Sequence, residues 1–254
     1  MTDSRPRFIF IGGLHRSGTT LLASMLDEHP DISGLRNTGV PQDEGQHLQD
    51  EMVVADDLGG PGRFAFSSRA HLVESDATDP LIALRLREAW QPYADTTRSH
   101  IVEKSPPNLL RFRYLQAVFP DALMIAIVRH PVAVAHATEF WAKSSVQLQL
   151  EHWLAAHEKF EGDRAQLQHL KFMRYEDLVR DPAAVLGPIT NYLGLKPFAP
   201  LANVRGDTNA RYFRRYRHSK FVPPRIKNFR DVLHFERRLQ DLHYGYSLLD
   251  KASN

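Results

Sequence analysis

The opening of the chain constrains its fold more than any other stretch of the sequence. An apolar run at residues 8–11 contains aromatic and β-branched residues and ends at Gly12 and Gly13, which predicts a buried parallel strand. Residues 19–28 carry leucines and a methionine at helical spacing, and a His-Pro pair ends the pattern because the residue before proline avoids the α region. The chain therefore opens as a strand, a glycine loop and a helix, an order in which a loop can bind phosphate.

Strand-like and helix-like segments alternate through much of the remaining chain. We predict strands at 100–103, 122–128 and 171–174, and helices at 81–90, 108–119, after Pro131, and at 147–170, 182–193 and 231–242. Such alternation is typical of parallel βαβ units, so we expect a P-loop-like three-layer α/β/α fold around a parallel central sheet.

Two other stretches have no clear periodicity. Glycine, proline and acidic residues interrupt residues 31–66, which predicts a long irregular loop of the kind that is usually functional or disordered. From about residue 200 the chain is basic and irregular before the last predicted helix. We find no internal repeat and no linker-like stretch, and we therefore predict a single domain over residues 1–254.

Composition excludes several classes of site. The 254 residues are 43% hydrophobic and 24% charged, as in ordinary globular proteins, and a net charge of +2 is too small to indicate a nucleic-acid partner. The chain has no cysteine, which excludes disulfides, a thiol nucleophile and a thiolate zinc site. No apolar run approaches the length of a membrane span, and the first residues do not resemble a secretory signal, so we expect a cytoplasmic protein.

The glycine loop GGLHRSGTT at residues 12–20 differs from a nucleoside-triphosphate P-loop at one position. Such a loop continues with lysine after its second glycine, whereas Thr19 and Thr20 follow Gly18 here, and the positive charge lies earlier, at Arg16. Unpaired N–H groups at the helix start, the Arg16 guanidinium and the hydroxyls of Ser17, Thr19 and Thr20 can bind a phosphate without that lysine.

A second cation follows the apolar run at 122–128, which ends directly at Arg129. An NTPase would place an acidic metal ligand at such a strand end. An arginine there repels Mg²⁺ and attracts a second anion. Each feature alone would fit a glycine turn or a solvent-facing arginine, but together they predict a nucleotide with phosphates at two separate positions and no metal.

Four segments together resemble the sulfotransferases that use 3′-phosphoadenosine 5′-phosphosulfate (PAPS). RSGTTLL at 16–22 is similar to their 5′-phosphosulfate loop, and VRHPVAVAHAT at 128–138 is similar to their 3′-phosphate motif. The segments at 103–122 and 172–182, EKSPPNLLRFRYLQAVFPDA and FMRYEDLVRDP, also match. The resemblance is closer to the bacterial and tyrosylprotein branch than to the cytosolic aryl branch. It implies transfer of a sulfuryl group from PAPS to an acceptor hydroxyl or amine, with no metal.

The resemblance also implies roles for individual residues. Arg16 and the loop amides would bind the 5′-phosphate, Arg129 the 3′-phosphate, and Lys104 would neutralise the leaving oxygen. The 3′-phosphate motif departs from the family at Ala137, where serine is usual. Thr138 comes next, but on a helix its side chain would point about 100° away, which puts that phosphate contact in doubt.

The sequence leaves the catalytic base open. The histidine of the cytosolic branch would fall at Pro106, and the tyrosylprotein branch uses a glutamate in the loop after the first helix. The segment VPQDEGQHLQ in that loop offers Glu44, with His47 and Asp43 as alternatives. We predict Glu44, because a carboxylate partly removed from water becomes a stronger base. A solvated acidic loop would explain each of these residues taken singly.

The basic C-terminal segment has two interpretations. Residues 205–230 contain nine Lys or Arg and one acid, Asp207, and such a run is usually a solvated face. The functional interpretation is a lid over the nucleotide's 3′-phosphate or a dock for an acidic acceptor. The family closes its site with a basic segment, so the resemblance implies a lid that includes Arg211 and Arg214 near the 3′-phosphate.

Two further functions fit parts of the sequence. A nucleotide kinase or other NTPase of this architecture would need a loop lysine and an acidic metal ligand, which are missing. A non-catalytic module would bind a polyanion through the basic tail. The acceptor (a small molecule, a glycan or a peptide) and the oligomeric state stay open.

Overall fold

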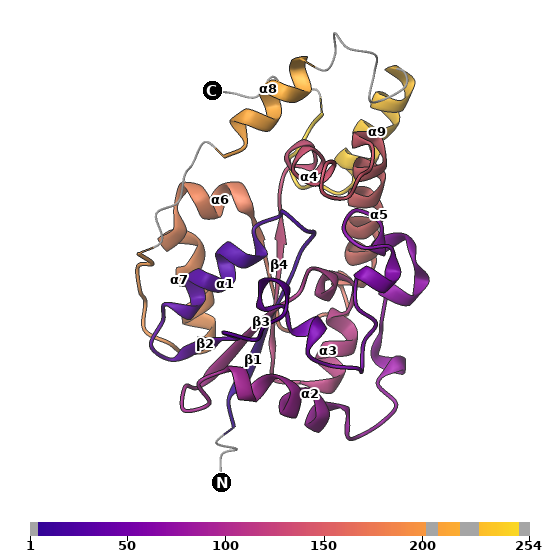
Figure 1. Cartoon of the computed structure of the whole chain (residues 1–254). Coiled ribbons are helices and arrows are strands. Elements are labelled where there is room, and N and C mark those ends of the chain that lie inside the picture. The colour runs from indigo at the N-terminus through magenta and orange to yellow at the C-terminus, as the bar shows by residue number, and fades with distance from the viewer. Residues whose placement is uncertain (1–4, 202–207, 219–228, 249–254) are drawn as a thin grey trace.

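A computed structural model describes residues 5–201, 208–218 and 229–248. Within these residues the centre of the molecule is a parallel sheet with the strand order β2-β3-β1-β4-β5 (Figure 1). The strands are β1 (Arg7–Gly12), β2 (Ile32–Gly34), β3 (His100–Lys104), β4 (Leu123–Val128) and β5 (Leu170–Arg174). In the centre of the sheet Ile11 of β1 lies opposite Lys104 of β3 on one side and Ile125 of β4 on the other. The predicted parallel central sheet is confirmed.

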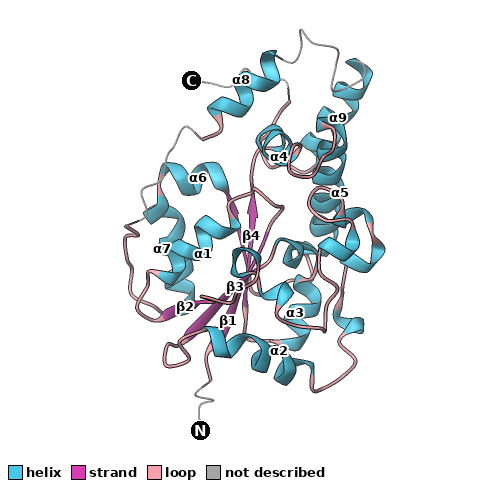
Figure 2. Cartoon of the chain, in the orientation of Figure 1, coloured by secondary structure: helices cyan, strands magenta, loops and turns pink. Residues whose placement is uncertain are grey.

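Helices cover both faces of this sheet (Figure 2). Along β1 the side chains alternate, so Phe8 and Phe10 enter one hydrophobic core and Ile9 and Ile11 enter the other. The core of Phe8 and Phe10 includes side chains from α2 (Ile82–Trp90), α3 (Phe112–Val118) and α5 (Val146–Arg164). The opposite core includes side chains from α1 (Thr19–Asp27), α6 (Tyr175–Arg180) and α7 (Pro182–Leu193). This is the three-layer arrangement that the sequence predicts.

Several elements differ from the sequence-based expectation. The stretch 31–66, expected to be irregular throughout, contains β2 and a series of short 3₁₀ turns. The helix predicted at 108–119 begins as a 3₁₀ turn at Pro106–Leu110, where two prolines remove backbone donors, and only α3 is α-helical. The helix predicted at 147–170 ends at Arg164, because Leu170 already belongs to β5. Helices α6 and α8 (Ala210–His218) were not expected.

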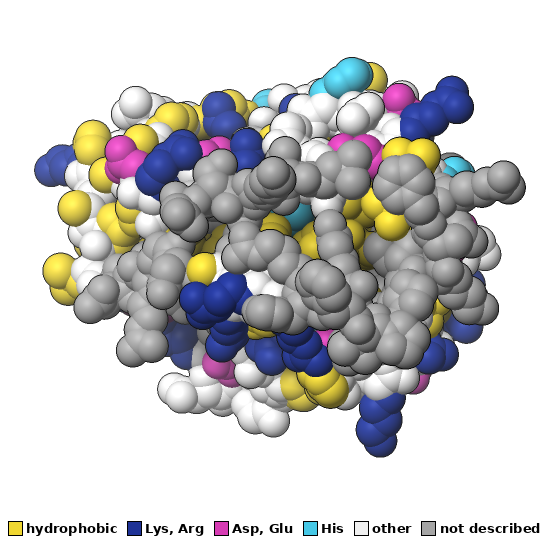
Figure 3. All heavy atoms as spheres, turned by 90° about the horizontal axis from the view of Figure 1, so that it is seen from above, with side chains coloured by type: hydrophobic (Ala, Val, Ile, Leu, Met, Phe, Trp, Pro, Cys, Tyr) yellow, Lys and Arg dark blue, Asp and Glu magenta, His cyan; other side chains and the backbone are white. Residues whose placement is uncertain are grey.

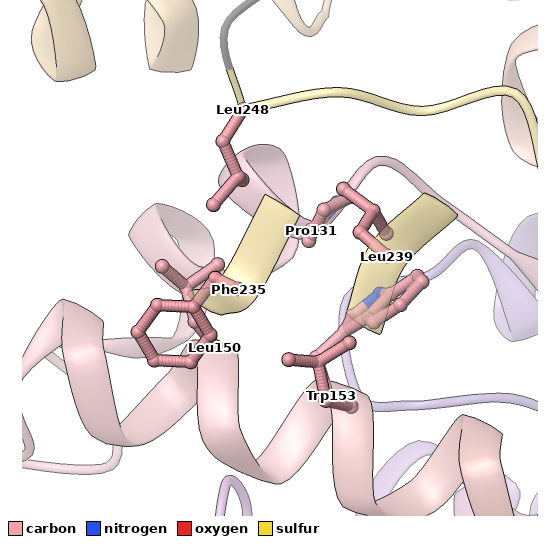
Figure 4. Close-up of a pocket in the computed structure, with 7 residues that line it drawn as sticks. Pro131, Leu150, Trp153, Phe235, Leu239 and Leu248 are labelled. Carbon is pink, nitrogen blue, oxygen red and sulfur yellow. The ribbon is translucent and has the colours of Figure 1, made fainter. Parts of the chain in front are cut away.

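An apolar cluster attaches the C-terminal part of the chain to the sheet end. Helix α9 (Phe229–Asp241) faces α5 and the start of α4 (Pro131–Thr138), which follows β4 almost directly (Figure 1). Six of the side chains that surround the small apolar pocket between them are labelled in Figure 4: Pro131, Leu150, Trp153, Phe235, Leu239 and Leu248. The Trp153 indole also donates a hydrogen bond to the Arg129 carbonyl (3.0 Å), so this cluster fixes the backbone where β4 ends.

His157 of α5 is a buried neutral base in this region. Its ring stacks on Trp153 with 3.9 Å between the ring centroids, and Nδ1 donates to the Trp153 carbonyl at 2.7 Å. Burial lowers the pKa of His157 from its ordinary value of 6.5 to about 4. The unfolded chain therefore binds a proton at a higher pH than the folded chain does.

This difference predicts a pH-dependent loss of stability on the acid side. The His157 contribution is present above pH 6.5 and is lost as the pH falls toward 4, by up to about 1.4 kcal/mol per pH unit. In the variant His157→Phe the free energy of unfolding should fall less steeply over this range, whatever its value at pH 7. Urea unfolding at pH 7, 5.5 and 4.5 measures both slopes, and equal slopes would contradict a neutral His157 in the folded protein.

Candidate functional site

The predicted anion-binding residues meet at one edge of the sheet. Parallel strands present their carboxyl ends together, so the loop after β1, the end of β3 and the residue after β4 are neighbours. A cavity of about 570 Å³ opens there, a size typical of ligand sites. The predicted residues that line it are Arg16, Gly18, Thr19, Thr20, Glu44 and Arg129.

The glycine loop has the backbone geometry of an anion-binding loop. Gly18 has a φ of +102°, and a Cβ atom there would lie 2.5 Å from the ring of Tyr175, so a side chain at this position would force Tyr175 to move. Helix α1 begins at the next residue, Thr19, and its first N–H groups have no partner inside the helix. Ser17 is fully buried and its Oγ has no hydrogen-bond partner among the described residues, and its role as a phosphate ligand stays a prediction.

Arg129 is held rigidly at the cavity wall. Its side chain is buried, and Nη1 donates to the carbonyl oxygen of Arg16 at 2.9 Å. Arg16 has a φ of +70°, an uncommon left-handed conformation for an arginine. The Arg129 guanidinium lies 4.2 Å from the centroid of the Tyr175 ring, and burial lowers the pKa of Arg129. The Arg129 side chain is therefore hydrogen-bonded to the backbone of the glycine loop at Arg16.

Glu44 and Lys104 form a buried ion pair at the same edge. Lys104 Nζ lies 3.3 Å from Glu44 Oε1, and both side chains are less than a tenth exposed. The other carboxylate oxygen accepts a hydrogen bond from Gln46 Nε2 at 2.6 Å. Burial lowers the pKa of Lys104, and the Glu44 carboxylate opposes this shift. Lys104 itself lines a smaller adjoining cavity of about 100 Å³.

The two alternative bases are placed differently from Glu44. Asp43 lines the smaller cavity, and one of its oxygens accepts hydrogen bonds from Thr38 N and Oγ1 at 2.9 and 2.6 Å. These bonds lower the pKa of Asp43, so its carboxylate is a weak base that stabilises the loop. His47 Nε2 lies 3.9 Å from Glu44 Oε2. The geometry favours Glu44, and the assignment stays a prediction.

Sequence reasoning missed the residue that holds the Glu44 loop in place. Glu103 is fully buried and accepts hydrogen bonds from Gly45 N (3.0 Å), Ser105 Oγ (2.6 Å) and Asn108 Nδ2 (2.6 Å). Burial raises the pKa of Glu103. From the other side, Trp90 Nε1 donates to the Gly45 carbonyl at 2.9 Å. The signal was an acidic residue inside the apolar strand sequence IVEK.

Aromatic side chains form another part of the cavity wall that was not predicted. His15 and Trp141 both line the cavity, with 5.4 Å between their ring centroids. Burial lowers the pKa of His15 to about 3, so this imidazole is neutral. Trp141 also lies beside the Arg16 guanidinium, at 5.6 Å from the ring centroid. An acceptor that reaches Glu44 through this cavity would pass along a neutral aromatic surface.

The structure does not bring the remaining predicted residues into the cavity lining. Thr138 is buried, its Oγ1 has no hydrogen-bond partner in the described part of the chain, and neither it nor Ala137 is among the lining residues. On α8 the Arg211 guanidinium lies on the Tyr212 ring, at 4.5 Å, and Arg214 is exposed. Residues 205–207 and 219–228 of the basic segment lie outside the described residues.

The end of the molecule that carries α8 and α9 has a mixed surface. Lysine and arginine side chains lie there beside hydrophobic ones (Figure 3). The roles of Arg211 and Arg214 as nucleotide ligands stay predictions.

Comparison with known proteins gives the family. The model of the sulfotransferase family matches residues 6–200. The chain belongs to the sulfotransferase family. The matched range contains the glycine loop, Glu44, Lys104 and Arg129, so the cavity is built from the family's part of the chain.

Two curated proteins match part of the chain. Nodulation protein NoeE of Sinorhizobium fredii is 27% identical over 51% of this chain and 30% of its own length. Protein-tyrosine sulfotransferase 1 of Danio rerio is 30% identical over 51% of this chain and 34% of its own length. The chain thus spans about a third of the length of these relatives.

A solved structure shares the fold along nearly the whole chain. Sulfotransferase STF9 of Mycobacterium avium superposes with a TM-score of 0.58 at 16% identity, and the match covers 96% of this chain and 78% of that one. The α/β fold of the family is therefore confirmed for this sulfotransferase-family chain.

Two features are absent from the described residues. None of the described helices is both long enough and apolar enough to cross a bilayer. Within the same residues no three or more His, Cys, Asp or Glu side chains are grouped as metal ligands would be.

Proposed function

We propose that this chain transfers the sulfuryl group of PAPS to a hydroxyl or amine of an acceptor. The observation that carries the proposal is the single cavity in which Arg16 and Arg129 provide two cations beside the buried pair of Glu44 and Lys104. PAPS has phosphates at its 5′ and 3′ positions, which matches two separate cations. Membership of the sulfotransferase family supports the same reaction.

The arrangement assigns a task to each group. The loop N–H groups at the start of α1 and the Arg16 side chain would hold the 5′-phosphosulfate, and Arg129 would hold the 3′-phosphate. The acceptor oxygen attacks sulfur in line, the bond from sulfur to the 5′-phosphate oxygen breaks, and adenosine 3′,5′-bisphosphate leaves. Glu44 takes the acceptor proton, and Lys104 stabilises the negative charge that grows on the leaving oxygen.

The proposal names one donor, PAPS, but several classes of acceptor. We propose a small molecule, a glycan or a peptide that presents a hydroxyl to Glu44 and passes the aromatic wall of His15 and Trp141. We also propose a bacterial source, which the match to the Sinorhizobium protein supports, and a cytoplasmic location, which the absence of cysteine supports.

Thermal unfolding with nucleotides tests the donor. Adenosine 3′,5′-bisphosphate at a hundred times its Kd should stabilise the protein by about 2.7 kcal/mol. For a protein of this size the midpoint should rise by roughly 5–10 °C. ATP with Mg²⁺ should give a smaller shift, because the loop has no lysine for a γ-phosphate.

The alternative functions give different results in the same experiment. A shift with ATP and Mg²⁺ alone would support a kinase or NTPase. A shift with sulfated polysaccharide but not with the bisphosphate would support a non-catalytic polyanion-binding module.

A further inference from the structure

A side chain from beyond the family match holds the Arg129 guanidinium. Asn209 lies just before α8 and is 80 residues from Arg129 in the sequence. Its Oδ1 accepts hydrogen bonds from Arg129 Nε at 2.8 Å and from Arg129 Nη2 at 2.6 Å. Arg129 is thus clamped between Asn209 and the Arg16 carbonyl.

Glu176 determines which end of the Asn209 amide faces the arginine. Asn209 Nδ2 donates to Glu176 Oε1 at 2.8 Å, and the same oxygen accepts the His130 backbone N–H at 3.0 Å. The other oxygen, Oε2, accepts the Tyr246 hydroxyl at 2.5 Å. An ionised carboxylate only accepts hydrogen bonds, so the Asn209 amide nitrogen must face Glu176 and its oxygen must face Arg129.

Among the described residues, the hydrogen bonds of Arg129 leave one N–H group on each terminal nitrogen. A guanidinium has five N–H donors, one on Nε and two on each of Nη1 and Nη2. Asn209 takes one from Nε and one from Nη2, and the Arg16 carbonyl takes one from Nη1. The two remaining N–H groups belong to Nη1 and Nη2. These two terminal nitrogens can together bind two oxygens of one phosphate. Arg129 lines the cavity, where such a phosphate would lie.

Helix α8 keeps Asn209 in this position. The Phe213 ring meets the His130 ring at 4.7 Å between the ring centroids, and Arg215 Nη2 lies 2.7 Å from Glu139 Oε1. These contacts attach α8 to α4, the helix that begins two residues after Arg129. The position of Asn209 therefore depends on the docking of α8.

We propose that Asn209 is a positioning residue for recognition of the nucleotide's 3′-phosphate. Asn209 acts through Arg129. Its oxygen binds Nε and Nη2 from the side, so that the remaining N–H groups of Nη1 and Nη2 face the phosphate. Glu176 fixes the orientation of Asn209. The inference rests on the proposed function, because it takes the 3′-phosphate as the ligand of Arg129.

Isothermal titration with two nucleotides tests this role. Adenosine 3′,5′-bisphosphate has the 3′-phosphate, and adenosine 5′-monophosphate lacks it but is otherwise alike. In Asn209→Ala the Kd of the bisphosphate should rise about tenfold, while the Kd of the monophosphate should stay within about twofold. Asn209→Asp should weaken bisphosphate binding further, because one carboxylate oxygen would repel Glu176 and the other would neutralise the Arg129 charge that attracts the phosphate. Asn191→Ala, at an exposed asparagine of α7, is the matched control and should leave both constants unchanged.

The pattern of results separates failure of the inference from failure of the proposed function. If the wild-type protein does not prefer the bisphosphate over the monophosphate, the proposed donor is wrong. If the wild type prefers the bisphosphate and Asn209→Ala keeps the same ratio of constants, Asn209 has no positioning role. An equal loss for both nucleotides would mean a general structural effect, and tighter bisphosphate binding would mean that Asn209 competes with the phosphate; either result overturns the proposal.

Discussion

Glu44→Gln is expected to slow sulfuryl transfer by about 10²–10⁴-fold, the usual contribution of a positioned general base. Glutamine has nearly the same size as Glu44, and Glu103 still accepts the Gly45 N–H, so the loop should keep its shape. The amide cannot take the acceptor proton. Single-turnover transfer from ³⁵S-labelled PAPS, to an acceptor that the wild type turns over, measures the rate, and titration with adenosine 3′,5′-bisphosphate should show that the nucleotide site is intact.

Variants of the two alternative bases are the controls for this result. Asp43→Asn removes a carboxylate that is bound to Thr38, and His47→Asn removes an imidazole 3.9 Å from Glu44. Both should keep transfer within about tenfold of the wild type. A larger loss in either variant than in Glu44→Gln would move the base to that residue.

Lys104→Met is expected to lower the rate of the chemical step by about 10²–10³-fold, as loss of one group that stabilises transition-state charge usually does. Methionine keeps much of the length of the side chain, so the buried volume at the end of β3 changes little. The cation near the leaving oxygen disappears, and Glu44 loses the partner 3.3 Å from its carboxylate. The loss should therefore appear in the single-turnover rate.

Binding measurements decide whether Lys104 acts in the transition state or only in the ground state. Removal of an interaction that is made mainly in the transition state lowers the rate and leaves ground-state affinity nearly unchanged. An unchanged single-turnover rate at saturating PAPS, combined with a large rise in the Kd of the bisphosphate, would show that Lys104 serves binding alone.

The parts of the fold that the sequence predicted correctly are those with strong hydrophobic patterns that extend over many residues. The apolar runs of β1 and β4 identified the parallel sheet, and the strand–loop–helix order located the glycine loop before α1. Strand β2 was missed because Ile32–Gly34 offers three residues, too few for a periodic signal. Helix α8 was missed because four of its nine residues are arginine, and its tertiary contacts, such as Phe213 on His130, are not visible in the local pattern.

The residues of the candidate site also divide into those that the sequence predicts and those that it misses. Arg16, Lys104 and Arg129 lie at or shortly after the carboxyl ends of β1, β3 and β4. These ends meet at one edge of the sheet, so topology alone brings the three residues together. Glu103, Gln46 and Asn209 act through hydrogen bonds to groups tens of residues away, or to a side chain whose orientation depends on the folded loop. A local pattern carries no information about such partners.

The connectivity of the sheet has a consequence for the order in which the protein matures during synthesis. Strand β5 ends at Arg174, so the ribosome has made every described strand before it reaches Asn209 or Tyr246. Synthesis runs from the N-terminus, so the residues of the sheet and the glycine loop are already present while the clamp on Arg129 is still missing. We therefore expect a nascent chain to form its sheet first and to reach its full affinity for the nucleotide last.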